Sequence, residues 1–187
     1  HLSIRRQRQM CIRDRLEKYH EDLIICSACI GGEIPQHILN GRMDKAEESV
    51  LWFKNLFGED YYLEIQRHET HDPNAAQDVY PHQVTANKAI LELARKHNIK
   101  VIATNDVHFV NAEDAEAHDR LICLSTGKDL DDPNRMRYTK QEWMKTTAEM
   151  NTIFSDIPEA LSNTLEIADK VEFYSCLLYT SPSPRDS

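Results

Sequence analysis

The chain has 187 residues, of which 41% are hydrophobic and 28% charged, a balance typical of one soluble globular domain with a core of its own. It contains no run of about 18 apolar residues and no secretory signal pattern, which excludes a membrane-spanning helix and gives no indication of secretion. Five cysteines without regular spacing argue against a disulfide framework, so we expect a cytoplasmic protein with no membrane partner.

The net charge of −9 is unevenly distributed along the chain. Residues 1–15 carry a net charge of +4, and residues 176–187 carry none. The stretch 16–175 therefore holds 16 basic and 29 acidic residues, a net charge of −13. An acidic segment repels a phosphate backbone, so we expect any main DNA-binding surface of this protein to lie elsewhere.

The two ends of the chain, HLSIRRQRQMCIRDR and CLLYTSPSPRDS, differ abruptly in composition from the middle. Neither shows a sustained apolar period, and both resemble read-through translations of sequencing-adapter DNA. We interpret residues 1–15 and 176–187 as non-native, adapter-derived segments, the alternative being a basic arm and a disordered linker. On this interpretation both ends make few contacts with the core.

The middle of the chain alternates predicted strands and helices, with glycines at several boundaries. Strand, helix, strand, helix, strand in this order predicts an α/β fold with a mainly parallel sheet. After Asp114 the pattern becomes helical. The predicted strands are 22–26, 61–65 and 100–104, and the predicted helices are 33–39, 44–57, 83–97, 115–126, 140–145, 148–154 and 158–171.

Two predicted strands are followed by residue types that bind metal ions. Cys29 lies in the loop after the first strand, and Asp106 and His108 follow the third strand with i, i+2 spacing. Functional side chains of parallel α/β folds gather at the carboxyl ends of the strands, and thiolate, carboxylate and imidazole groups all bind zinc. The residues alone leave a second interpretation open, in which Cys29 is a small packing residue and Asp106 a helix cap beside a surface histidine.

Other candidate residues carry less information. His68, His71 and Asp72 fall in the polar loop 66–81, where we expect surface residues rather than a metal pair. His118 lies on a predicted helix and is expected to pack or to cap it. The sequence contains no phosphate-binding or dinucleotide fingerprint and no carboxylate pair of the kind that holds two metal ions in polymerases.

Several segments together resemble one protein family, the alpha subunits of bacterial DNA polymerase III. DLIICSACIGGEIPQHILNG and LARKHNIKVIATNDVHF are similar to metal-motif segments of that family's PHP (polymerase and histidinol phosphatase) domain, and AEDAEAHDRLICLSTGKDLDDPNRMRY and FSDIPEALSNTLEIADKVEF to the region after that domain. The resemblance implies part of a distorted (β/α)7 barrel with mainly parallel strands. It places the C-terminal part of the PHP domain at 16–125 and a helical connection into the polymerase region at 126–175.

The resemblance also implies a metal centre. Cys29, Asp106 and His108 match family positions that bind a divalent metal, zinc or manganese, and the family's other ligands lie upstream of this segment. We therefore expect the Cys29 sulfur to lie within roughly 6 Å of the Asp106 or His108 side chain, given ligand bonds of about 2.0–2.3 Å. Magnesium would bind at the polymerase site, beyond residue 187. The chain itself then has no catalytic residue for DNA synthesis and is expected to be inactive.

In this family the intact protein is a DNA-directed DNA polymerase that uses DNA and deoxynucleoside triphosphates. The resemblance implies a PHP region that supports the proofreading exonuclease subunit or acts as a metal-dependent 3′–5′ exonuclease, and a sliding clamp as a further partner. The alternatives are a stand-alone PHP phosphoesterase similar to histidinol phosphatase and a degenerate PHP scaffold without chemistry. Retention of Cys29 and His108 argues against the degenerate scaffold.

Overall fold

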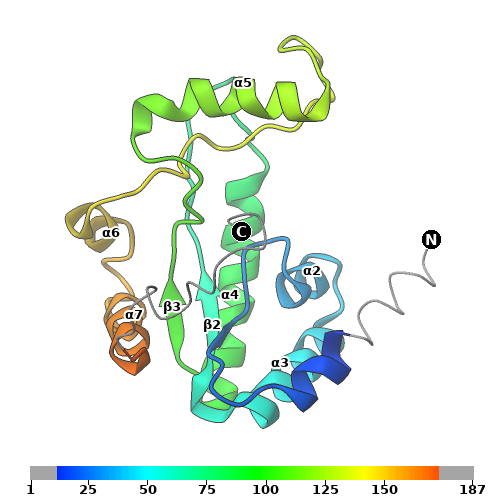
Figure 1. Cartoon of the computed structure of the whole chain (residues 1–187), viewed down its shortest axis with the longest axis vertical. Coiled ribbons are helices and arrows are strands. Elements are labelled where there is room, and N and C mark those ends of the chain that lie inside the picture. Colours follow the sequence, from blue (N-terminus) through cyan, green and yellow to red (C-terminus); the bar gives the residue numbers. More distant parts are fainter. Residues whose placement is uncertain (1–11, 173–187) are drawn as a thin grey trace, which may run out of the picture.

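A three-stranded parallel sheet organises the chain (Figure 1). The computed structural model describes residues 12–172. The strands are β1 (Ile25–Cys26), β2 (Tyr61–Ile65) and β3 (Val101–Ala103), in the order β1-β2-β3. Ile25 lies opposite Tyr61, and Leu63 lies opposite Val101. The predicted α/β class with a parallel sheet is confirmed, whereas closure into a seven-unit barrel stays a prediction.

Helices connect the strands and follow the last of them, as the apolar periodicity predicts. Two helices end where a residue adopts a left-handed conformation, α4 at Asn98 (φ 51°) and α5 at Gly127 (φ 64°). Within the described residues, no helix has the length and apolar character needed to cross a membrane. The helices are α2 (Glu33–Leu39), α3 (Met43–Phe57), α4 (Val79–His97), α5 (Ala115–Thr126), α6 (Thr147–Ile153) and α7 (Glu159–Lys170), with a further helical stretch at 12–18 and 3-10 turns at Gly58–Asp60 and Ala112–Asp114.

Alternation along the strands separates an apolar face of the sheet from a polar one. The apolar face packs against α2, α3 and α4, and its cluster extends to Phe154 and to Ala160 of α7. On the other face the Tyr62 hydroxyl donates to Glu166 of α7 at 2.6 Å, and Glu64 accepts from Thr104. Buried members of the apolar cluster include Val50, Leu63, Ile65, Ile90, Leu93, Val101 and Ala103.

Three predicted elements differ from the structure by more than one residue. The strand predicted at 22–26 is reduced to β1 (Ile25–Cys26), because Asp22 lies in a turn with a positive φ (60°). The helix predicted at 83–97 begins earlier, at Val79, and accommodates Pro81 in its first turn, where backbone N–H groups have no acceptor within the helix. The helix predicted at 140–145 is wrong, because this segment is extended and Trp143 forms a parallel bridge with Phe109. The Asn105 amide donates to the carbonyls of Gln141 (2.9 Å) and Trp143 (2.7 Å) and holds the segment against the loop after β3.

Part of the segment interpreted as adapter-derived is described by the structure. Residues 12–15 are helical, and the Arg13 guanidinium pairs with Glu33, lies 3.4 Å from the Ser49 hydroxyl and stacks 4.7 Å over the Trp52 ring. Arg13 therefore contacts α2 and α3, and the expectation that both ends make few contacts with the core stays a prediction. Residues 1–11 and 173–187, on which the rest of that interpretation falls, lie outside the described residues.

Candidate metal centre

The candidate ligands lie on loops that leave the carboxyl ends of β1 and β3. The loops after β2 and β3 run toward α5 (Figure 1). Backbone strain is concentrated in this region: Ala28 (φ 63°), Asp106 (φ 44°) and Lys140 (φ 65°) are three of the five described non-glycine residues with positive φ. Such conformations cost about 1–3 kcal/mol each and cluster at functional sites. The strain singles out the backbone beside Cys29 and at Asp106 itself.

Hydrogen bonds fix the orientation of the His108 ring. Its Nδ1 lies 2.6 Å from the backbone carbonyl oxygen of Asp106, and a carbonyl oxygen only accepts, so Nδ1 carries the proton and donates. In the neutral ring the lone pair is then on Nε2. A metal-binding histidine characteristically donates its other ring N–H to a carbonyl or carboxylate. His108, which is exposed to solvent, has this arrangement.

Tyr138 contacts the ring of His108, one of the candidate ligands. Its hydroxyl is 3.2 Å from His108 Nε2, and the two ring centroids are 4.7 Å apart. Burial and the negative charges of Asp106, Glu142 and Cys29 raise the pKa of Tyr138. The predicted separation of roughly 6 Å between the Cys29 sulfur and the Asp106 or His108 side chain stays a prediction.

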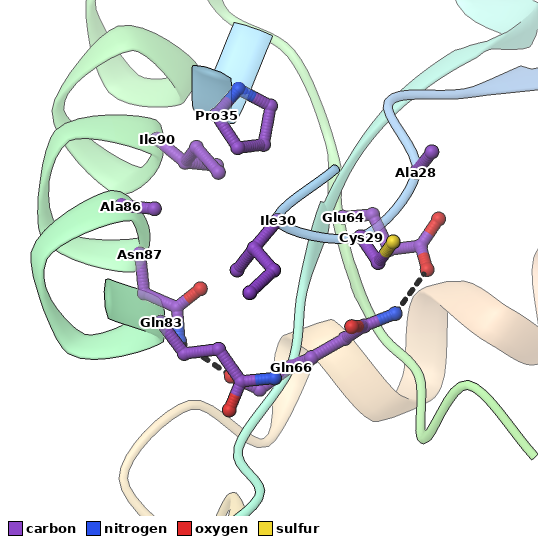
Figure 2. A pocket seen from close by; sticks show the side chains of 10 residues that line it. All are labelled: Ala28, Cys29, Ile30, Pro35, Glu64, Gln66, Gln83, Ala86, Asn87 and Ile90. Carbon is purple, nitrogen blue, oxygen red and sulfur yellow. Dashed lines mark hydrogen bonds between the residues drawn. The ribbon is translucent and has the colours of Figure 1, made fainter. Parts of the chain in front are cut away.

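Cys29 also lines a small cavity between its loop, β2 and α4 (Figure 2). Glu64 lines the same cavity, and its carboxylate accepts from the Gln66 amide at 2.9 Å. The cavity offers about 10 Å³ to the centre of a water molecule, which is enough for about one water. The buried Gln66 Oε1 has no hydrogen-bond partner among residues 12–172, so a water in this cavity would have an acceptor.

The chemistry of the donors fits a divalent metal ion, but their arrangement by itself does not. A thiolate, a carboxylate and an imidazole suit zinc and related ions. Among residues 12–172, however, no three histidine, cysteine, aspartate or glutamate side chains are placed so that they could hold one ion. Cys29, Asp106 and His108 are therefore not a complete centre in the described part of the chain.

His68 is buried, with only 2% of its surface exposed, so its assignment to the surface of the polar loop is wrong. Its Nε2 donates to the Asn105 carbonyl at 3.1 Å, and its Nδ1 accepts from the Gln83 amide at 3.0 Å. Burial lowers the pKa of His68, which favours the neutral ring. With both ring nitrogens hydrogen-bonded to buried partners, His68 connects the loops after β2 and β3.

The remaining candidates behave as expected. His71 is exposed, and Asp72 pairs with Lys140 at 2.8 Å. His118 packs its ring against Phe109, His108 and Tyr138, with centroid distances of 5.1, 5.7 and 5.0 Å. Burial, and next the charge of His108, lower the pKa of His118. A packing role for His118 agrees with this environment.

The environment of His68 predicts a pH dependence of stability. Because the folded pKa lies below the ordinary value of about 6.5, the unfolded chain binds more protons as the pH falls. The part of the free energy of unfolding that depends on a neutral His68 is fully present above about pH 6.5. Below that pH it decreases by up to about 1.4 kcal/mol per pH unit. Urea unfolding between pH 7.5 and 5.5 should show this slope. The slope should shrink in His68→Asn and persist in His71→Asn; equal slopes in both variants would contradict the assignment.

The structure adds residues that the sequence did not single out. Glu142 is 2% exposed, and its Oε1 accepts from the backbone N–H and hydroxyl of Thr139, at 3.0 and 2.6 Å. The backbone N–H of His108 donates to the Glu142 carbonyl at 2.8 Å. Hydrogen bonds of three residues hold the segment 138–143 against the loop after β3. These residues are Asn105, Tyr138 and Glu142. Most of their partners lie 30 or more residues away in the sequence, and the bond between Glu142 and Thr139 forms in a local turn. Neither kind of contact leaves a periodic pattern in the sequence from which these residues could be predicted.

Comparison with known proteins identifies the relatives of the chain. Residues 2–68 match the PHP domain family, a range that includes Cys29 and begins inside the segment interpreted as adapter-derived. The boundary at residue 15 stays a prediction. The chain is 42% identical over 173 residues to the DNA polymerase III subunit alpha of Borreliella burgdorferi, which covers 92% of this chain and 14% of the relative.

Two further relatives give the same result. The DNA polymerase III subunits alpha of Campylobacter jejuni and Pseudomonas aeruginosa are each 40% identical, over 83% and 84% of this chain and 13% of each relative. The chain thus spans about one seventh of the length of these curated relatives. Over most of its length, the chain is a relative of one segment of the bacterial DNA polymerase III alpha subunits, with a PHP domain match in its N-terminal region.

Proposed function

We propose that this chain is a segment of the alpha subunit of a bacterial replicative DNA polymerase, and that Cys29, Asp106 and His108 contribute ligands to the metal centre of its PHP region. The orientation of His108 carries the proposal. Its Nδ1 donates to the Asp106 carbonyl and leaves Nε2 to bind a metal, at the carboxyl end of a parallel strand. The strained backbone at Asp106 supports the same assignment.

Upstream residues of the full-length subunit would complete this centre, since the described residues do not close it. Zinc or manganese suits the donor types, and either ion would act as a Lewis acid toward a phosphate oxygen. The PHP region would then act as a 3′–5′ exonuclease or support the proofreading subunit. Template-directed synthesis, with DNA, deoxynucleoside triphosphates, magnesium and the sliding clamp, would belong to the rest of the subunit.

A stand-alone PHP phosphoesterase is the second candidate. The similarity to polymerase alpha subunits covers 83–92% of the chain and extends well beyond residue 68, which favours the polymerase. The uninterrupted reading frame in flanking genomic sequence tests this choice. A polymerase predicts a long downstream continuation with a pair of metal-binding carboxylates. A stop codon near residue 175 would instead favour the phosphoesterase.

The isolated 187-residue chain should neither extend a primed DNA template nor degrade a 3′ end when magnesium, manganese or zinc is added. Its acidic middle repels DNA, and the described residues contain no group of ligands able to hold an ion. The full-length subunit should extend the primer under the same conditions. The measurement is product length on a denaturing gel, and primer extension by the isolated chain would refute the proposal.

A further inference from the structure

A cleft of about 420 Å³ lies between α6, α7 and the end of β3. Figure 1 places these two helices on the side of the sheet away from α2 and α3. Met150, Leu161 and Leu165 give the cleft an apolar wall, and Lys145 is its one cationic lining residue. Its volume falls in the range of about 300–1,000 Å³ that is usual for binding sites. The cleft is therefore large enough to receive side chains of another molecule or segment.

The ammonium group of Lys145 is held in place at this cleft. It donates to the Gln141 carbonyl and lies 4.5 Å from the centroid of the Trp143 ring. Among residues 12–172 it forms no ion pair, and the nearby Glu149 carboxylate instead accepts from the N–H and hydroxyl of Thr146, at 2.8 and 2.7 Å. Burial lowers the pKa of Lys145, while negative charges nearby raise it. A half-buried cation without an ion-pair partner favours an incoming anion.

The charge around the cleft favours a carboxylate over a phosphate. Residues 16–175 carry a net charge of −13. Helix α7 itself contains Glu159, Glu166 and Asp169 against Lys170 alone. A group with one negative charge is repelled by these surroundings less than a phosphate with nearly two. The anion that suits Lys145 is thus the side chain of an aspartate or glutamate.

The apolar wall of the cleft favours a protein segment over a small molecule. Leu165 lines the cleft but is 67% exposed, and exposed apolar surface beside a cleft is typical of protein contacts. The chain matches only 13–14% of the length of its relatives, so most of the polypeptide of a full-length subunit lies outside it. Covalent linkage gives a segment of the same subunit a high effective concentration at the cleft.

We propose that the cleft between α6 and α7 is the docking site for another segment of the same full-length subunit. That segment presents a carboxylate to Lys145 and an apolar side chain to Leu165. The inference rests on the proposed function, because it requires the chain to be part of a longer subunit. It does not depend on the candidate metal centre.

Crosslinking of the full-length subunit tests the proposal. The photoreactive amino acid benzoylphenylalanine is placed at Leu165, and mass spectrometry identifies the peptide that it captures after irradiation. We expect an intramolecular crosslink to a peptide outside residues 1–187 that contains aspartate or glutamate. The same group at Tyr19, which is 62% exposed and does not line the cleft, is the control and should not capture this peptide.

The role of Lys145 is tested by reversing its charge. Lys145→Glu should lower the yield of the Leu165 crosslink at least about fivefold, because like charges brought together across a contact cost several kcal/mol. Conversion of the carboxylate in the captured peptide to lysine should then restore the yield. Lys88→Glu, at an exposed lysine of α4, makes the same change in net charge and should leave the yield unchanged.

Crosslinks that form only within residues 1–187, only to a second molecule or not at all would overturn the proposal. If Lys145→Glu fails to fold, the crosslink in the subunit with an unchanged Lys145 decides. Primer extension by the same preparations separates this inference from the proposed function. A subunit that extends primed DNA without the expected crosslink refutes the docking alone, whereas a reading frame that stops near residue 175 refutes both.

Discussion

The double substitution Cys29→Ala and His108→Ala in the full-length subunit should lower metal affinity at the PHP centre by at least about 100-fold. Loss of groups that only support a ligand already costs about 10–100-fold, and this variant removes two of the proposed ligands. Metal content after gel filtration, measured by elemental analysis, reports the effect. This measurement does not depend on which activity the centre has.

A matched double variant controls for the loss of one cysteine and one histidine. Cys26 and His71 are both exposed and lie outside the proposed ligand set, so Cys26→Ala with His71→Ala should retain the metal. Both variants should extend a primed template, which shows that the protein is folded. Equal metal content in the two double variants would mean that the ligands are wrongly assigned.

Gly32→Ala should destabilise the chain by about 2–4 kcal/mol, the range of strained or overpacked substitutions. A Cβ atom built on Gly32 would lie 2.5 Å from the Ser27 carbonyl oxygen and 3.0 Å from that of Cys29. Both contacts are with backbone, and the Gly32 N–H donates to the same Cys29 carbonyl at 2.7 Å. Relief of the clash therefore requires movement of the loop that carries Cys29. Urea unfolding at neutral pH measures the loss.

Gly31→Ala is the matched control for this prediction. A Cβ atom on Gly31 would meet only the Cys29 sulfur, at 3.7 Å, which is an ordinary van der Waals contact. Its stability should stay within about 1 kcal/mol of the wild type, since alanine also reduces the entropy of the unfolded chain. If the two glycine variants were equally stable, the close packing inferred for the Cys29 loop would be wrong.

The candidate ligands could be proposed from the sequence, but their surroundings could not. Cys29, Asp106 and His108 follow strand patterns and match family motifs, so their positions at strand ends were predictable. The contact between Tyr138 and His108 joins residues 30 positions apart, across a segment with no periodic pattern. The burial of His68 escaped prediction because it arises from partners on α4 and the loop after β3.

Local patterns in the sequence were sufficient for most elements. The strand Tyr61–Ile65 and the helices Glu33–Leu39 and Ala115–Thr126 occur with the predicted bounds, because apolar periodicity and glycine or asparagine stops act over a few residues. Only the tertiary structure decided the extended path of residues 140–145. There the Asn105 side chain binds two carbonyls, and the bridge to Phe109 supplies backbone contacts that outweigh the helical preference of the segment.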